Sequence, residues 1–177
     1  MSLTVSNRVL KKILRDCKRS AEAVSAAGDA DTILIAFPFN EQHQNIAYRV
    51  FAPILKAGGV KTCSLIAETN RGLLEDISTS QIIDLTVPED LQKQPLLSET
   101  VNQQLQQCRV AVALDLNAEF HPYTAAAVLK SRAVRRIGFL SENSEHFFNI
   151  QISKKGEDPI ESSYRYMLSL IRDSGLY

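Results

Sequence analysis

One stretch of the sequence, residues 109–139, constrains the fold more than any other. It contains two short apolar runs, 110–116 and 134–139, separated by an alanine- and leucine-rich segment of helical composition at 120–130. A strand, a helix and a second strand of these lengths are typical of a crossover between parallel strands. The sequence therefore predicts a doubly wound α/β domain, in which ligands bind at the carboxyl ends of the strands.

The rest of the chain continues this alternation. Apolar runs at 32–37, 60–67 and 82–87 and an alternating pattern at 147–152 predict four more strands, the last of them at a sheet edge. Helices are predicted at 40–56, where Pro53 should kink or restart the helix and Gly58 and Gly59 end it, and at 98–108. A last helix should begin with Asp158 as N-cap and Pro159 at the first position. We expect a mostly parallel, Rossmann-like six-stranded sheet of order 3-2-1-4-5-6 with helices on both faces.

The amino-terminal segment is expected to form a separate helix. Between residues 5 and 26, apolar residues recur at the helical period and basic residues occupy the other side. The favoured interpretation is that residues 1–28 form an amphipathic helix packed on a single α/β domain, residues 29–177. The alternative is a helix that docks on a membrane surface or a partner.

Composition excludes some classes of function. The 177 residues include 20 Lys and Arg against 20 Asp and Glu, so electrostatic capture of nucleic acid is not expected. No apolar run is long enough for a transmembrane segment, and no signal-peptide pattern opens the chain. The three cysteines show no paired spacing and are expected to be buried or inert thiols. These features together predict a cytoplasmic protein.

No cofactor is predicted. The loop after the first predicted strand, residues 37–41, contains no glycine, so neither a dinucleotide-binding turn nor a P-loop fits there. The three histidines lack the spacing of metal ligands, and no metal site is expected.

Candidate site residues follow the first and fourth strands. The predicted strand order puts its switch point between these strands, so residues 37–44 and 115–121 should face each other across a crevice. We take as candidate catalytic residues Glu41, His43 and Asp115, and as candidate substrate-binding residues Asn40, Asn117 and His121. The alternatives are structural: Asp115 would cap its own loop, and the loop histidines would be solvated or cap a helix.

The motifs around the central stretch resemble a known family. An acid at the end of a strand (Asp115), an Ala/Leu-rich helix ending in Lys130-Ser131-Arg132, and then Arg135-Arg136-Ile137-Gly138-Phe139 resemble the amino-terminal half of bacterial heptosyltransferase-like glycosyltransferases of family 9. The continuation also fits, with His146-Phe147-Phe148-Asn149 and a last helix carrying Tyr164, Tyr166 and Leu168. The resemblance implies one half of a two-domain GT-B fold, in which the amino-terminal domain receives a lipopolysaccharide acceptor and the other domain binds a nucleotide-sugar donor.

The chain departs from that family in two ways. The sequence stops at Tyr177, where the donor domain is expected, and the Gly-Asp pair after the first strand, whose Asp is the proposed base, is replaced by residues 39–43. Glu41 or His43 would have to substitute. The resemblance thus implies a stand-alone relative of the acceptor-binding half, a binding or interaction module with a sugar, sugar-phosphate, protein or homodimeric partner. The alternative is a glycosyltransferase subunit for hexosyl or heptosyl transfer that uses a separate donor-binding chain.

Overall fold

The computed structural model describes residues 10–11, 14–15, 30–77, 80–86, 97–154, 156, 158–173 and 175. Within these residues, six parallel strands form one sheet of order β3-β2-β1-β4-β5-β6, which confirms the predicted topology. The strands are β1 (Thr32–Ala36), β2 (Lys61–Ala67), β3 (Ser80–Leu85), β4 (Val110–Asp115), β5 (Arg135–Phe139) and β6 (Ile150–Ile152).

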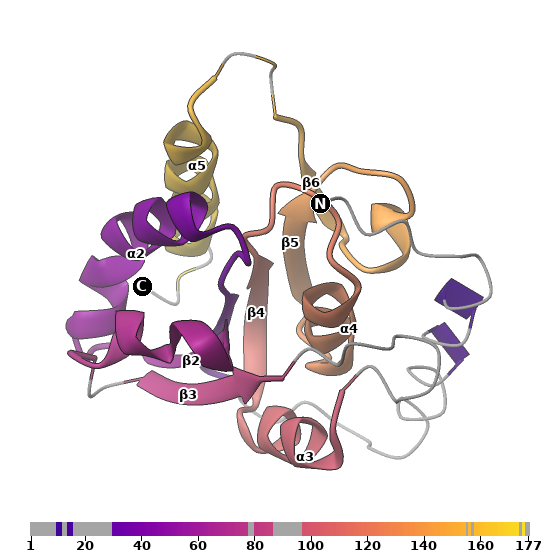
Figure 1. Ribbon diagram of the computed structural model, residues 1–177, viewed down its shortest axis with the longest axis horizontal. Coiled ribbons are helices and arrows are strands. Elements are labelled where there is room, and N and C mark those ends of the chain that lie inside the picture. Colours follow the sequence, from indigo (N-terminus) through magenta and orange to yellow (C-terminus); the bar gives the residue numbers. More distant parts are fainter. Residues whose placement is uncertain are drawn as a thin grey trace.

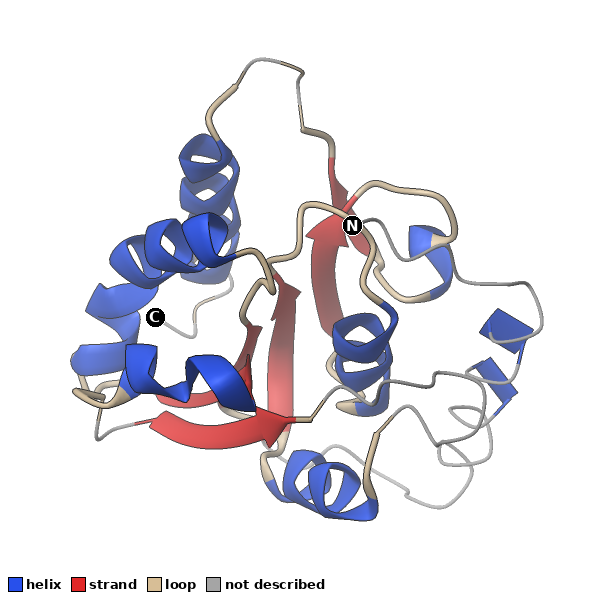
Figure 2. Cartoon of the chain, viewed as in Figure 1, coloured by secondary structure: helices blue, strands red, loops and turns tan. Residues whose placement is uncertain are grey.

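Helices cover both faces of the sheet (Figures 1 and 2). On one face lie α2 (Glu41–Lys56) and α5 (Ile160–Arg172), and on the other lie α3 (Glu99–Gln107) and α4 (Pro122–Lys130). Each face has its own apolar core, because alternate residues of a strand point to opposite sides: Leu34 enters one core, and Ile33 and Ile35 enter the other. All five residues of β1 are buried, as expected for a central parallel strand.

Four described residues of the amino-terminal segment are helical. Leu10 is buried in the core beneath α3 and α4, and Leu14 packs against the same core. Lys11 and Arg15 are exposed. The rest of the predicted helix at residues 1–28 lies outside the described residues.

Helix α2 runs through Pro53, so the expected restart of the helix there is wrong. Pro53 lies on the exposed side of α2, and its carbonyl accepts a hydrogen bond of 3.1 Å from the Ala57 N–H. The missing proline N–H is therefore tolerated at the solvated surface. The predicted glycine stop is confirmed, because Gly58 has a φ of 64°, in the left-handed region.

Two predicted boundaries near the carboxyl end are wrong. The last strand begins at Ile150 and not at 147, because Phe147 and Phe148 are both buried and do not alternate. Their backbone N–H groups donate to the carbonyl of Ser144 and close the short 3₁₀ helix η2 (Ser144–His146). Pro159 and not Asp158 is the N-cap of α5, and its side chain offers no hydrogen-bond acceptor.

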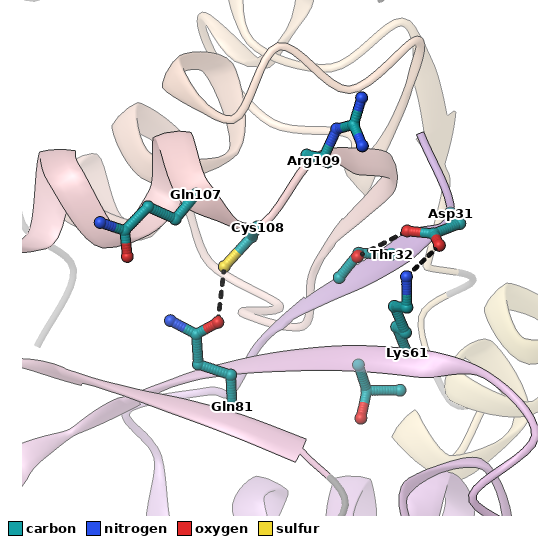
Figure 3. A pocket seen from close by; sticks show the side chains of 8 residues that line it. Asp31, Thr32, Lys61, Gln81, Gln107, Cys108 and Arg109 are labelled. Atoms are coloured by element: carbon teal, nitrogen blue, oxygen red, sulfur yellow. Dashed lines mark hydrogen bonds and ion pairs between the residues drawn. The ribbon is translucent and has the colours of Figure 1, made fainter. Parts of the chain in front are cut away.

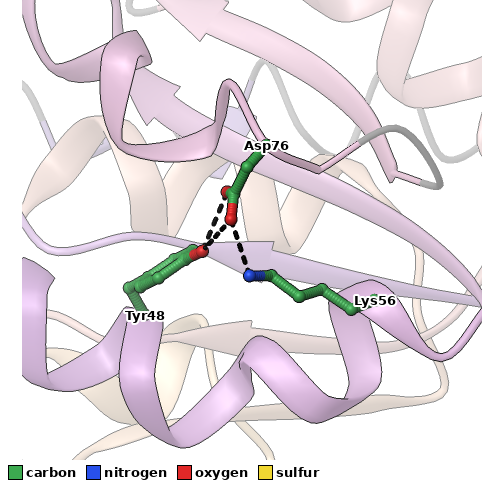
Figure 4. A network of polar contacts seen from close by, with 3 residues as sticks. All are labelled: Tyr48, Lys56 and Asp76. Carbon is green, nitrogen blue, oxygen red and sulfur yellow. Dashed lines mark hydrogen bonds and ion pairs between the residues drawn. The ribbon is translucent and has the colours of Figure 1, made fainter.

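A surface network ties α2 to the turn after the 3₁₀ helix η1 (Glu68–Leu74) (Figure 4). The Tyr48 hydroxyl lies 2.8 Å from both carboxylate oxygens of Asp76, and Lys56 Nζ lies 2.6 Å from one of them. The hydrogen bond from Lys56 lowers the pKa of Asp76. These groups are solvent-exposed, so the network contributes little to the free energy of folding.

Gly138 in β5 is predicted to tolerate no side chain. A methyl group there would lie 2.5 Å from two ring carbons of the buried Phe148. We expect Gly138→Ala to lower the free energy of unfolding in urea by about 1–3 kcal/mol, because the core would be overpacked. The matched control is Gly59→Ala, since a methyl group there meets no atom within 4 Å. Equal unfolding midpoints for the two variants would contradict this packing.

Candidate functional site

Strands β1 and β4 are neighbours in the sheet, and the loops that follow them diverge from each other. The two strands pair in parallel with Ala36 opposite Asp115, and the Leu116 N–H donates to the Ala36 carbonyl at 3.0 Å. Beyond this point the chain turns into α2 on one face and into α4 on the other (Figure 1). This is the predicted switch point of the sheet, where doubly wound folds bind their ligands.

A cavity of about 370 Å³ lies at this point. It is lined by residues that follow three strands: Pro38, Phe39, Asn40 and His43 after β1, Asn117, Ala118, Glu119, Phe120 and His121 after β4, and Lys154 after β6. Four of the six candidate residues from the sequence thus line one cavity, namely Asn40, His43, Asn117 and His121. Glu41 and Asp115 are not among the described residues of its wall.

Asp115 lies below the cavity, in the sheet. It is 2% exposed, and its Oδ1 accepts hydrogen bonds from the backbone N–H of Asn117 at 3.0 Å and from the Asn117 side-chain amide at 2.8 Å. Burial raises its pKa to about 6, although the bonds from Asn117 oppose this shift. The carboxyl group therefore caps its own loop, which is the structural alternative considered for this residue.

Asn117 connects the two loops that form the crevice. Its Oδ1 accepts a hydrogen bond of 3.0 Å from the backbone N–H of Phe39, which lies in the loop after β1. Its amide nitrogen also donates to the Thr124 hydroxyl at 3.1 Å, in the first turn of α4. One side chain therefore holds together the two loops, Asp115 and the start of α4.

An aromatic pair forms part of the cavity wall. The rings of Phe39 and His121 stack with centroids 3.8 Å apart and an interplanar angle of 21°. Burial lowers the pKa of His121 to about 4, so the imidazole is neutral at neutral pH. Its Nδ1 is buried and has no hydrogen-bond partner among the described residues. The imidazole is therefore an uncharged part of the cavity wall.

His43 is the titratable imidazole on the α2 side of the cavity. Its pKa is lowered by burial and then by Lys154, while Glu119 opposes the shift. A neutral imidazole at a cavity wall can accept a proton from a bound hydroxyl group. The neighbouring Asn40 caps α2, because its side-chain oxygen accepts a hydrogen bond of 3.0 Å from the His43 backbone N–H. This oxygen therefore already has one partner within the protein.

Three features around the cavity favour an anionic group, and the Glu119 carboxylate in the same wall opposes them. Helices α2 and α4 both begin beside it, with Asn40 and His121 as their N-caps, and helix amino termini carry partial positive charge. Lys154 adds a full charge from the loop after β6. Lys154 and Phe39 also line the cavity and are not among the residues predicted for the site, although both follow strands that end at this edge. The described residues contain no group of three or more metal-ligating side chains, and none of their helices is long and apolar enough to cross a bilayer.

Comparison with known proteins connects the fold to glycosyltransferases. No protein-family model and no curated protein matches the sequence. Among solved structures, the chain is similar to a glycosyl transferase family 9 protein from Veillonella parvula, with a TM-score of 0.58 and 13% identity over 84% of this chain and 43% of that one. It is also similar to the E. coli heptosyltransferase WaaC with ADP-2-deoxy-2-fluoro heptose, with a TM-score of 0.55 and 11% identity over 78% and 47% of the two chains. The chain spans less than half of either structure and has the α/β, Rossmann-like fold of part of a family 9 glycosyltransferase.

The buried Asp115 predicts a specific pH dependence of stability. Its folded-state pKa of about 6 lies above the ordinary value of 3.8, so the protonated form favours folding. This stabilisation is fully present below about pH 4 and is lost as the pH rises through 6. In Asp115→Asn, which keeps an acceptor oxygen, the free energy of unfolding relative to wild type should rise by about 3 kcal/mol between pH 4 and 8. The measurement is urea unfolding of both proteins across this range; a difference that stays constant with pH would contradict the assignment.

Proposed function

We propose that this chain is a relative of the acceptor-side half of a family 9 glycosyltransferase and acts as a binding module for a sugar or sugar phosphate. The cavity at the carboxyl ends of β1 and β4 carries the proposal, because it combines a stacked aromatic pair with a lysine and two helix amino termini. Its volume of about 370 Å³ falls in the range of small-molecule sites, roughly 300–1,000 Å³.

Each part of the cavity suits one part of such a ligand. The stacked rings of Phe39 and His121 offer an apolar surface to the C–H face of a sugar ring. The Glu119 carboxylate adds acceptors for hydroxyls, whereas the Asn117 amide hydrogens are already donated to Asp115 and Thr124. Lys154 and the starts of α2 and α4 favour an anionic group such as a phosphate. The ligand class that uses all three features is a sugar phosphate.

A second function belongs to a different class, catalysis of hexosyl or heptosyl transfer from a nucleotide sugar to a lipopolysaccharide-type acceptor. The neutral His43 at the cavity wall favours it, because it can take the proton of an acceptor hydroxyl. Of the three candidate catalytic residues, His43 lines the cavity, Glu41 is exposed at the start of α2, and Asp115 is buried below. Transfer also requires a bound donor, which a protein partner or a second copy of the chain would supply.

The test of binding is calorimetric titration of the purified chain with hexose and heptose phosphates, the corresponding free sugars and nucleotide sugars. We expect the sugar phosphates to bind, and Lys154→Ala to weaken their binding about tenfold, because a charge-assisted contact is lost. The same variant should change the affinity of a free sugar little. The matched control is Lys56→Ala, at the other end of α2 and outside the cavity.

Three outcomes distinguish the functions. Binding that depends on Lys154 supports the module, and the absence of heat with every ligand contradicts it. A glycosylated product that forms only when a donor-binding chain is added, and disappears in His43→Ala while ligand affinity stays, would establish the catalytic function instead.

A further inference from the structure

Two cysteines that are distant in the sequence touch at the other edge of the sheet. Cys63 lies in β2, Cys108 is the C-cap of α3, and their sulfur atoms are 3.0 Å apart. Both are free thiols, with exposures of 0% for Cys63 and 6% for Cys108. The sequence shows no motif that pairs them, because they are 45 positions apart.

The fold brings both sulfur atoms to one place. Cys63 points to the face of the sheet that α3 and α4 cover, and Cys108 turns back onto that face as α3 ends. The Cys108 sulfur also lies 3.2 Å from the Gln104 carbonyl oxygen and 3.5 Å from Oε1 of Gln81, the β3 residue paired with Cys63. It therefore sits between the helix end and two strands.

One of the two cysteines lines a cavity. This second cavity, of about 280 Å³, lies at the amino-terminal ends of the central strands, and Cys108 forms part of its wall (Figure 3). The remaining lining residues are polar or charged: Asp31, Thr32, Lys61, Thr62, Gln81, Gln107 and Arg109. Cys63 is not among the described residues of this wall, so a small polar oxidant in the cavity would meet Cys108 first.

The two thiols also differ in acidity. The hydrogen bond between them lowers the pKa of Cys108 and raises that of Cys63, and burial raises it further. Cys108 is thus the cysteine that both lines the cavity and is more readily ionised, which are the properties of an oxidisable cysteine. Cys63 has the position of a resolving thiol.

We propose that Cys63 and Cys108 are a redox pair that a peroxide converts into an intramolecular disulfide between β2 and the end of α3. The Cys108 thiolate attacks one oxygen of hydrogen peroxide, and the O–O bond breaks. Cys108 becomes a sulfenic acid, and the released hydroxide takes up a proton and leaves as water. The Cys63 sulfur then attacks the Cys108 sulfur, the S–O bond breaks, and the hydroxyl leaves as a second water with the Cys63 proton. Two electrons pass from the thiols to the peroxide.

The disulfide requires a small movement and should stabilise the fold. The sulfur atoms must approach by about 1 Å to reach bonding distance. The new bond would join segments 45 positions apart and so restrict the unfolded chain. We expect the thermal midpoint of the oxidised protein to rise by about 5–10 °C and to return when a thiol reductant is added. This inference is independent of sugar binding at the opposite edge.

The test is treatment of the folded protein with hydrogen peroxide, alkylation of the remaining thiols, digestion with trypsin and mass spectrometry. The oxidised protein should remain a monomer. Its digest should contain peptides 62–71 and 94–109 joined by a disulfide, and a reductant should separate them. Recovery of both peptides unlinked, with Cys63 alkylated, would overturn the proposal, and so would a disulfide that joins two chains.

Three single substitutions separate the pair from the third cysteine. Cys17→Ser should leave the linked peptides unchanged. Cys63→Ser should stop the reaction at a sulfenic acid on Cys108, detected with a dimedone probe, and Cys108→Ser should leave Cys63 reduced. Oxidation of Cys63 in the Cys108→Ser protein at the wild-type rate would contradict the order of the two steps. Circular dichroism of each variant before oxidation establishes that it is folded.

Discussion

The hydrogen bonds of the Asn117 side chain hold together the loop after β1 and the loop after β4, which meet at the switch point of the sheet. Parallel strands that diverge into helices on opposite faces leave a crevice, and nothing in the sheet hydrogen bonding fixes its width. Asn117 supplies that restraint by accepting the Phe39 N–H on one side and donating to Thr124 on the other. Asp115 holds the asparagine in place through two further bonds. A second restraint comes from α5, where the Tyr164 hydroxyl donates to the Leu116 carbonyl at 2.7 Å.

The two edges of the sheet then differ in chemistry. At the carboxyl edge, the helix starts, Lys154 and the stacked rings surround the cavity that we propose binds a sugar phosphate. At the amino edge, where α3 ends, Cys108 lies against Cys63, the Gln104 carbonyl and the Gln81 side chain. The same parallel arrangement produces both, because it places all strand ends of one kind together. The length of the strands therefore separates the proposed binding site from the proposed redox pair.

The sequence predicted the sheet because its signals are local. Short apolar runs separated by helical segments define the order, and the position of β1 between β2 and β4 follows from crossover rules. The last strand was predicted too long, because two consecutive buried phenylalanines depend on the turn at Ser144 and not on alternation. The sequence predicts a kink or restart at Pro53, because the exposure of this residue on α2 is a tertiary property that the sequence does not contain.

The site was predicted only in part, for the same reason. His43 and His121 follow neighbouring strands, and both line one cavity. The hydrogen bond from Phe39 to Asn117, the stacking of Phe39 on His121 and the contact of Cys63 with Cys108 depend on distances between segments far apart in the chain. No spacing pattern in a single sequence contains that information.

The role of Asn117 in holding the two loops together is tested most directly by amide hydrogen exchange at Phe39. The exchange is measured by NMR in the wild-type protein and in Asn117→Ala. The account predicts that the Phe39 amide is protected in the wild type and exchanges much faster in the variant. The Leu116 amide, which donates to Ala36 within the sheet, should keep its protection in both. Equal Phe39 exchange in the two proteins would show that the crevice is held without Asn117.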